Sequence, residues 1–432
     1  MKTFEIRNFG CRATQADGAA LASQLAGRGL SPASDHPDLV VLNTCTVTAA
    51  ADQDVHKAIH RLRRENPAAR ILVTGCYAQR APEQLAALDG VDWVVGNSHK
   101  TLIPEIVLGS DYHGNIHVGG FGRHQEFLSA PIVESGADRT RPNLKIQDGC
   151  HNRCSFCVIP LVRGGSRSAQ PDWVIEQMRS LARDYREIVL TGINLGRWGR
   201  DLARDNPPGR LRLVDLIRRM LDETPIQRLR LSSVEPMDFS DELLGLMAAS
   251  PRIAQHVHAP LQSGSDSVLR RMFRKYRPRH YAHRLRHARA LMPEAAIGAD
   301  VMVGFPGETA AEFAESRDFI ESMPFTYLHV FTYSERPGTR AAEAGHAVPM
   351  EIRKERNRVL RDLAARKNLA FRQSFVGRSL SVVTLQDGRA LSTNYLSVEL
   401  ARPGAANQLR DVRIGGLTAQ SLAEKVRLPV LT

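Results

Sequence analysis

The chain has 432 residues, 43% of them hydrophobic, and a formal net charge of +12 at pH 7. This length and apolar content favour about two to three packed domains and exclude a disordered chain. No stretch is long and apolar enough to cross a membrane, and the opening MKTFEIRNFG enters a strand pattern without a signal-peptide apolar region, so we expect a cytoplasmic protein with reduced cysteines.

Residues 1–120 alternate short apolar runs with helix-like stretches, which predicts a parallel βαβ (Rossmann-like) domain. Three of the runs, FEIRNFG, LVVLNT and RILVTG, each end at a cysteine: Cys11, Cys45 and Cys76. Because the carboxyl ends of parallel strands meet at one sheet edge, where ligands bind, we expect these cysteines, the sheet-edge triad, to converge on one metal site. Alternatively they are small thiols buried in a core.

A second set of cysteines, the loop triad, consists of Cys150, Cys154 and Cys157 in a C-x3-C-x2-C segment. Three thiolates on one loop can hold three irons of a 4Fe-4S cluster and leave the fourth iron open to a substrate or cofactor. Zinc is an alternative, but it usually takes four ligands in two pairs, and His151 lies too close to Cys150 to complete them. With Phe156 before the last cysteine, the spacing resembles the signature of the radical S-adenosylmethionine (SAM) enzymes. That resemblance implies that the open iron binds SAM.

Residues 144–350 repeat strand and helix at wider spacing, after a stretch at 114–143 that has little periodic signal and is predicted to be a linker. The candidate strands are LKIQDG, EIVLTG, RLRLSS, HVHAP, IGADVMVG and YLHVFTYS. Six strands with intervening helices predict a (β/α)6 partial barrel, and barrel active sites lie at the C-terminal ends of the strands. The loop triad directly follows the first strand, so it lies on the expected face.

Polar or glycine-rich residues follow several of these strands, and we expect some of them to contact SAM. The candidates are Phe156, Gly192, Asn194, Ser233, Glu235 and Gln262, with His258 and Asp300 in similar positions. A glycine lets the backbone approach a ligand closely, while hydroxyls and a carboxylate suit the ribose and amino group of SAM. Each candidate is also an ordinary residue of a strand-to-helix turn.

The positive charge is concentrated in two segments, 270–290 and 351–378. This favours a polyanionic partner such as RNA. The aromatics Phe273, Tyr276 and Tyr281 in the first segment could stack on bases. Alternatively, the segments are solvated helix faces and the aromatics belong to a core.

The second basic segment is predicted to be a helix that joins the barrel to a last region. From Ser379 onward the chain has short β-like runs, namely SLSVVTL, TNYLSVEL, LRDVRIGGL and EKVRLP. Runs of this kind separated by turn residues predict a small β-barrel. Compact β-barrels commonly bind oligonucleotides.

Over essentially its whole length the chain resembles the radical-SAM methylthiotransferases that modify adenosine 37 of tRNA. The resemblance rests on LNTCTV, VTGC, KIQDGC with its cysteine motif, LTGINLG, RLSSVEP, PLQSGSDSVLRRM, VGFPGET and YSERPGT. It implies a methylthiotransferase domain with an auxiliary cluster at 1–120, a radical-SAM core at 136–368 and an RNA-binding TRAM-like domain at 371–432. KIQDGC and HVFTYSERPGT are most similar to the branch acting on N6-threonylcarbamoyladenosine. The branches acting on isopentenyladenosine or on an aspartate of a ribosomal protein stay open.

The resemblance further implies two 4Fe-4S clusters with separate roles. The cluster at the loop triad cleaves SAM to a 5′-deoxyadenosyl radical, which removes the hydrogen from carbon 2 of adenine. The cluster at the sheet-edge triad delivers sulfur that a second SAM has methylated. The implied partners are the tRNA anticodon loop and a reducing electron donor, and we expect a monomer. Arg163 and Arg167 are candidates for pairing with the threonylcarbamoyl carboxylate, or else for pairing within the barrel.

Two other classes of protein share parts of this pattern. A radical-SAM methylase with an N-terminal cobalamin domain would also have a βαβ domain before a barrel. It would not need a cysteine at three strand ends, and no histidine lies in a comparable loop to bind cobalt. A non-catalytic iron–sulfur or RNA-binding protein would not need SAM-site residues after several strands.

Overall fold

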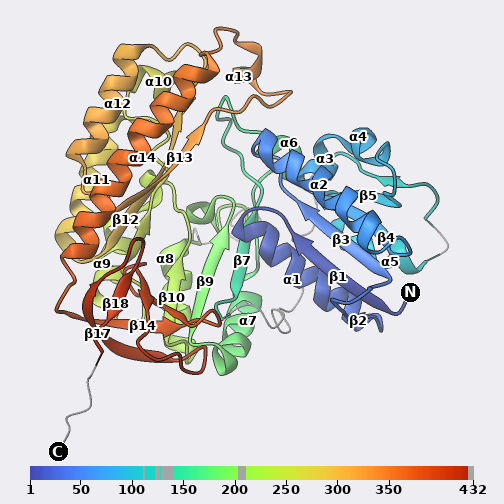
Figure 1. Ribbon diagram of the computed structural model, residues 1–432, viewed down its shortest axis with the longest axis horizontal. Coiled ribbons are helices and arrows are strands. Elements are labelled where there is room, and N and C mark those ends of the chain that lie inside the picture. Colours follow the sequence, from blue (N-terminus) through green and yellow to red (C-terminus); the bar gives the residue numbers. More distant parts are fainter. Residues whose placement is uncertain (110–111, 122–126, 128–139, 203–210, 427–432) are drawn as a thin grey trace, which may run out of the picture.

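The computed structural model describes residues 1–109, 112–121, 127, 140–202 and 211–426. Figure 1 shows three parts: the N-terminal domain in blue, a central set of parallel strands with outer helices, and a small barrel in red near the C-terminus. The predicted fold class, a mixed α/β chain with parallel sheets and a C-terminal β-barrel, is confirmed.

The N-terminal sheet is entirely parallel, as predicted. Its strands are β1 (Thr3–Asn8), β2 (Ser31–Pro32), β3 (Leu39–Thr44), β4 (Arg70–Gly75), β5 (Trp93–Gly96) and β6 (Ile116–His117), in the order β2-β1-β3-β4-β5-β6. The two outer strands were not expected, because two residues are too short for a periodic signal. β6 also shows that part of the predicted linker belongs to the sheet.

Helices cover both faces of this sheet. α2 (Ala49–Glu65), α3 (Cys76–Arg80) and α4 (Pro82–Ala86) pack on one face, and α1 (Arg12–Gly27) and α5 (Ile103–Leu108) pack on the other. Along β3, Val40 and Leu42 face the first group, and Leu39 and Val41 face the second. Burial on both faces explains why the strands are continuous apolar runs.

The central domain contains the six predicted parallel strands. They are β7 (Asn143–Asp148), β9 (Glu187–Gly192), β10 (Arg228–Leu231), β11 (His256–His258), β12 (Ala296–Val303) and β13 (Tyr327–Thr332). The first three pair in parallel, as do the last three, and hydrogen bonds such as Val234 N to His258 O (3.0 Å) join the two sets. Since no pairing joins β13 to β7 among the described residues, the barrel is open on one side, as predicted.

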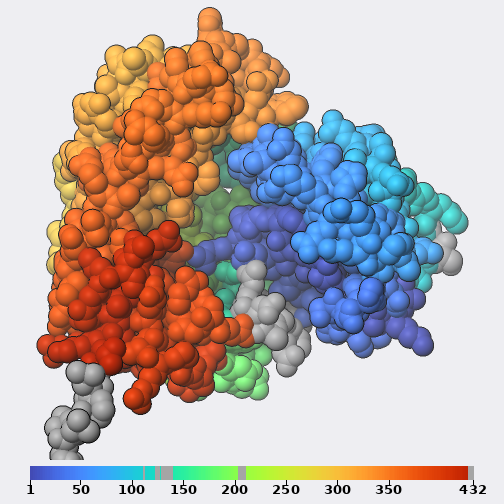
Figure 2. Space-filling model, in the orientation of Figure 1, coloured from blue at the N-terminus to red at the C-terminus, as the bar shows by residue number. Residues whose placement is uncertain are grey.

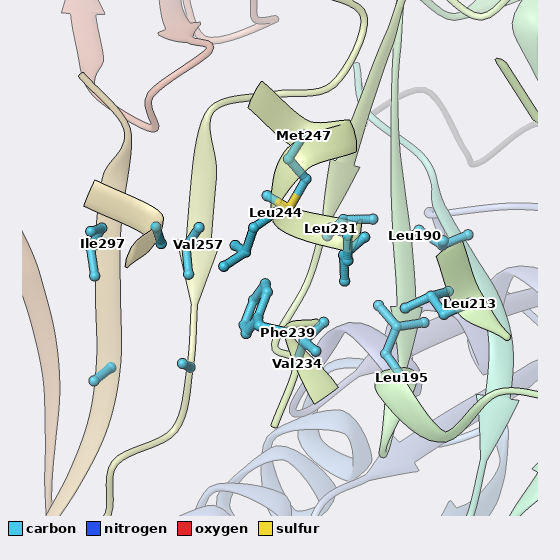
Figure 3. Close-up of a cluster of buried hydrophobic side chains, with 14 of the residues drawn as sticks. Leu190, Leu195, Leu213, Leu231, Val234, Phe239, Leu244, Met247, Val257 and Ile297 are labelled. Carbon is cyan, nitrogen blue, oxygen red and sulfur yellow. The ribbon is translucent and has the colours of Figure 1, made fainter. Parts of the chain in front are cut away.

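Helices pack around the outside of these strands. They are α7 (Pro171–Asp184), α8 (Leu213–Glu223), α9 (Asp241–Ala249), α10 (Asp266–Arg271), α11 (Pro278–Leu291), α12 (Ala310–Ser322) and α14 (Met350–Gln373). Figure 3 shows Leu190, Leu231, Val257 and Ile297, from four neighbouring strands, in the apolar cluster beneath these helices. The side chains between them along each strand therefore face the interior of the barrel.

The aromatic residues of the first basic segment have different environments. Tyr276 and Tyr281 are buried in the barrel core, whereas Phe273 is 46% exposed. The two tyrosines are therefore core residues rather than base-stacking platforms. In the second basic segment, which forms α14 as predicted, Arg353 and Arg356 are also buried. Part of the positive charge of this segment is thus buried inside the protein.

The C-terminal region forms a closed barrel in the order β14-β15-β16-β18-β17. Its strands are β14 (Ser379–Thr384), β15 (Arg389–Ser392), β16 (Ser397–Glu399), β17 (Leu409–Leu417) and β18 (Leu422–Glu424). The run TNYLSVEL is not one strand, because Tyr395 has φ +63° and turns the chain before β16. Of the run EKVRLP only Glu424 lies in a strand, and 427–429 are outside the described residues.

Arg230 fixes this small barrel to the central domain. Its guanidinium donates to Ser392 O (2.9 Å) and Thr393 O (3.1 Å), and it is held by the buried Glu187. The Tyr395 ring stacks on His256 at a centroid distance of 4.4 Å. In the described part of the chain, every helix is too short or too polar to cross a membrane.

Candidate metal centres at the barrel mouth

The loop triad begins directly after β7. Gly149 has φ +65°, and a side chain there would collide with the Gly164–Gly165 backbone, so glycine is needed to turn the chain into the loop. The sulfur of Cys150 accepts hydrogen bonds from Asn152 N (3.3 Å) and Asn194 Nδ2 (3.4 Å). N–H donors around a sulfur stabilise a thiolate and tune an iron–sulfur cluster.

Cys154 receives a charged donor. Arg274 Nη1 lies 3.3 Å from its sulfur, and the same guanidinium binds Glu235 at 2.5 Å. Burial, with smaller contributions from the neighbouring Cys154 and Cys150, raises the pKa of Cys157 to about 12 against a backbone hydrogen bond from Ile159. A bound cation reverses this effect, because it deprotonates a coordinating thiol. The N–H donors around Cys150 and Cys154 would stabilise the thiolates that a bound cluster requires.

The sheet-edge triad is assembled where the strand order reverses. β1 and β3 are neighbours, and their following helices α1 and α2 lie on opposite faces, which is the switch point where open α/β sheets bind ligands. Cys11 and Cys45 follow these two strands, and Cys76 follows β4. A Cβ on Gly10, whose φ is +135°, would lie 2.6 Å from the Cβ of Cys45.

The three sheet-edge sulfurs influence one another. Burial, together with the neighbouring Cys76 and Cys11, raises the pKa of Cys45 to about 12. The three sulfurs are thus near enough to affect one another's ionisation, and their role as ligands of one metal site stays a prediction. A tetrahedral zinc ion would hold sulfurs about 3.8 Å apart. Among the described residues, neither triad brings its three ligand atoms within 4.8 Å of one another, so neither is arranged as a compact site for a single ion.

A group of five charged side chains, the buried ion cluster, lies between the sheet-edge triad and the barrel. Its members are Asp17, Lys100, Lys145, Asp148 and Arg163. Burial raises the pKa of Asp17, but the nearby lysines and Arg163 outweigh this effect and hold it well below its usual range. Three cations face two carboxylates, which leaves one formal positive charge. Arg163 Nε lies 3.3 Å from the Cys76 sulfur, so a thiolate ligand there completes the balance.

Arg163 is therefore not available to contact a substrate. Its guanidinium binds Asp148 (2.9 Å) in β7 and Asp17 (2.9 Å) in α1, and it is 1% exposed. Arg167 donates to Arg163 O (2.9 Å) and Gly165 O (3.1 Å). Both arginines serve the second role that the sequence allowed, which is pairing within the structure.

The predicted SAM-contacting residues are only partly gathered at the loop triad. Asn194 and Glu235 are joined to it as described, and the Oδ1 of Asn194 is buried without a hydrogen-bond partner among the described residues. Gly192 lies against the side chain of Gln147, and Phe156 packs against the barrel core. The remaining two follow later strands: Ser233 is exposed after β10, and Gln262 has φ +66° and forms a bridge with β12. Their contact with SAM stays a prediction.

Arg274 was not identified from the sequence. It lies in a basic segment whose arginines cannot be distinguished by sequence alone. Its partners Cys154 and Glu235 are distant in the chain. A small pocket joins these residues, and its lining also includes Asn152, Arg197, Met237, Phe273, Lys275 and Tyr276.

The N-terminal domain contacts the barrel mouth on both sides of the opening. On the β7 side, Asn97 Nδ2 donates to Val162 O (2.7 Å) in α6 (Ile159–Arg163), beside the Arg163 contacts. On the β13 side, Arg336 binds Asp52 in α2 at 2.7 Å, and Ala49 N donates to Ser334 Oγ (3.1 Å). The two triads are therefore held at one mouth by different domains.

Two family models match the chain. Residues 3–96 match one described as uncharacterized protein family UPF0004, and residues 144–320 match the radical SAM superfamily. The chain is 36% identical to threonylcarbamoyladenosine tRNA methylthiotransferase of Aquifex aeolicus, over 91% of this chain and 95% of that protein. It is 39% identical to the enzyme of the same name from Bacillus subtilis, over 82% and 79%. It is also 34% identical to tRNA-2-methylthio-N(6)-dimethylallyladenosine synthase of Parafrankia, over 93% and 82%.

Solved structures share the fold. The radical SAM methyltransferase TsrM from Kitasatospora setae, with cobalamin and a 4Fe-4S cluster bound, aligns with a TM-score of 0.59 at 17% identity, covering 79% of this chain and 77% of that one. The cobalamin-dependent radical enzyme OxsB aligns with a TM-score of 0.51 at 13% identity, covering 84% and 56%. At such identities the likeness concerns architecture alone.

Proposed function

The chain belongs to the radical-SAM methylthiotransferase family, and we propose that it transfers a methylthio group to carbon 2 of N6-threonylcarbamoyladenosine at position 37 of tRNA. The observation that carries the proposal is the pair of cysteine triads at one barrel mouth. Two separate metal centres allow radical generation and sulfur delivery to act on the same base. A cobalamin-dependent methylase has no use for the second triad.

The residues present fit two 4Fe-4S clusters and SAM. When bound, these groups supply an electron, a hydrogen-abstracting radical and the sulfur and methyl groups. The loop triad holds one cluster, with Arg274 and Asn194 donating to its sulfurs at 3.3 and 3.4 Å. The sheet-edge triad holds the other, beside the positive charge of Arg163. Glu235, oriented by Arg274, offers a carboxylate to the SAM amino group.

The proposed partner is the anticodon loop of tRNA. The net charge of +12 and the closed C-terminal barrel support an RNA ligand. A reducing electron donor is also required, since SAM cleavage consumes an electron. We further propose that the protein acts as a monomer in the cytoplasm, where tRNA is modified and cysteines stay reduced.

The isopentenyladenosine branch is the second candidate, because relatives from it match at 34% identity over 93% of the chain. Purified, reduced enzyme tested on defined tRNAs separates the two. We expect mass spectrometry of the nucleosides to show a methylthio group on threonylcarbamoyladenosine and none on isopentenyladenosine. Modification of isopentenyladenosine alone, or of a ribosomal protein, would contradict the proposal.

A further inference from the structure

Three polar side chains form an inner-face group on the last strands of the barrel: His258 in β11, Asp300 in β12 and His329 in β13. His258 Nε2 and His329 Nδ1 each lie 3.2 Å from Asp300 Oδ1. Val257 and Val301, adjacent to them in sequence, pack in the apolar cluster beneath the outer helices. The group therefore faces the barrel interior, and nothing in the two triads or their supporting contacts uses it.

The group is fixed at its base and open at its top. Tyr327 OH lies 2.7 Å from both His258 Nδ1 and His256 Nε2, which holds the His258 ring in place. The exposed fractions of the side chains rise from 6% for His258 to 25% for Asp300 and 49% for His329. Of the two ring nitrogens of His329, only Nδ1 has a hydrogen-bond partner among the described residues. Its Nε2 is therefore available to a ligand.

An aromatic ring lies beside the open end. Phe331, two residues along β13 and on the same face as His329, is 46% exposed, and its ring lies edge-on to His329 at a centroid distance of 6.5 Å. Aromatic side chains of this kind stack on unpaired RNA bases.

Neighbouring residues link the inner-face group to the loop triad and to the N-terminal domain. The segment after β11 is held by Tyr276, whose OH donates to Leu261 O (2.7 Å). The same OH accepts a hydrogen bond from Arg274 Nε (3.1 Å), and Arg274 also contacts the Cys154 sulfur. The segment after β13 carries Ser334 and its contact with the N-terminal domain. Figure 2 shows the surface hollowed between that domain in blue and the orange C-terminal half, with green barrel atoms visible deeper in.

We propose that His258, Asp300 and His329 bind the threonylcarbamoyl substituent while the adenine ring stacks on Phe331. This inference rests on the proposed function and deepens it. Asp300 holds the Nδ1–H of His329, so Nε2 points outward. A protonated ring donates to the substituent's carboxylate, and a neutral ring accepts from its hydroxyl or N–H groups. An isopentenyl group would leave these polar atoms buried and unpaired, which is how a hydrogen-bonding site rejects an apolar analogue.

The same three side chains also suit a different ligand, a divalent metal ion. The three ligand atoms lie within 4.8 Å of one another, and two histidines with one carboxylate form a known transition-metal set. Which of the two ligands fits depends on whether the hydroxyl of Tyr327 donates its hydrogen bond to His256 or to His258. If Tyr327 donates to His256, His258 presents a lone pair to Asp300, as a metal site requires. If Tyr327 donates to His258, His258 donates to Asp300 and no ion is needed.

The test compares His329→Ala and His329→Gln with the wild-type holoenzyme. The probes are anticodon stem-loops that carry threonylcarbamoyladenosine or plain adenosine at position 37. We expect His329→Ala to weaken binding of the modified loop by about 10- to 100-fold, the loss expected for one hydrogen bond to a charged group, and to raise KM rather than lower kcat. Binding of the plain loop and SAM cleavage without RNA should not change. His329→Gln should restore part of the preference, because its amide can replace the ring nitrogen.

The matched control is His283→Ala, an exposed histidine on α11 outside the barrel, which should behave as wild type. Equal losses on both stem-loops would overturn the assignment of the inner-face group. So would one divalent ion per chain, measured by elemental analysis, that is present in wild type and lost in His329→Ala. An inactive wild-type enzyme on every threonylcarbamoyl tRNA would instead refute the proposed function itself.

Discussion

Replacing Arg163 with methionine removes the guanidinium that ties the sheet-edge triad to the barrel. Arg163 is 1% exposed, and it binds Asp17 at 2.9 Å, Asp148 at 2.9 Å and the Cys76 sulfur at 3.3 Å. Methionine keeps the apolar length of the side chain but leaves both carboxylates with less compensation. We therefore expect loss of stability and loss of sulfur delivery together.

The remaining lysines limit the loss of stability. Breaking a buried ion pair costs about 3–5 kcal/mol, because one charge stays buried without its partner. Here Asp17 keeps Lys100 at 3.1 Å, and Asp148 keeps Lys145 at 2.9 Å. The free energy of unfolding should thus fall by about 3 kcal/mol, the lower end of that range. Arg163→Lys should not restore it fully, since one ammonium cannot replace a fork that reaches two carboxylates and a sulfur.

Three measurements check this prediction. Denaturant unfolding of the metal-free protein gives the stability, iron analysis gives the cluster content, and product analysis separates SAM cleavage from methylthiolation. Arg163→Met should lower methylthiolation more than SAM cleavage, because among the described residues Arg163 bonds the sulfur of Cys76 and no sulfur of the loop triad. The control is Arg183→Met, an exposed arginine on α7. Unchanged unfolding and methylthiolation in Arg163→Met would refute the reasoning.

Three further predictions follow from the same structure. Cys154→Ala should retain about four irons and lose SAM cleavage, whereas Cys45→Ala should lose the other cluster yet still cleave SAM; loss of both clusters in either variant would argue against independent sites. Burial raises the pKa of Glu187, but its arginine partners outweigh this and lower it from 4.5 to about 2. Its contribution to stability is therefore present above pH 4.5 and lost as the pH falls toward 2. Glu187→Gln should flatten the acid dependence of unfolding in that window, and an unchanged slope would count against the assignment. Arg402→Ala with Arg413→Ala, both exposed on the C-terminal barrel, should weaken tRNA binding and reduce the slope of log K against log salt by about 2, and an unaltered slope would remove these side chains from the interface.

The strands and the place of a cysteine after each could be predicted because their signals are local. Runs such as LVVLNT and RILVTG are buried on both faces, and a cysteine after each run marks the sheet edge. The pairing of Arg163 with Asp17 could not be predicted, because 146 residues separate them and many arginines in the chain are equivalent by sequence alone. The same holds for Arg274 and Cys154, 120 residues apart. Strands of two residues, β2 and β6, carry no periodicity at all.

Because the six-stranded barrel is open on one side, the N-terminal domain forms part of the site instead of lying next to it. A closed barrel would surround its own interior, but here β13 and β7 are not joined among the described residues, and the N-terminal domain contacts the segments that follow each of them. The Asp17 contact on the β7 side is fully buried, and the Asp52–Arg336 contact on the β13 side is 14% and 6% exposed. The position of the sheet-edge triad over the barrel is thus set from two sides. If a base enters beside His329 as we propose, it therefore meets a mouth whose two cysteine triads are already held in fixed relation, and only the base itself has to be positioned.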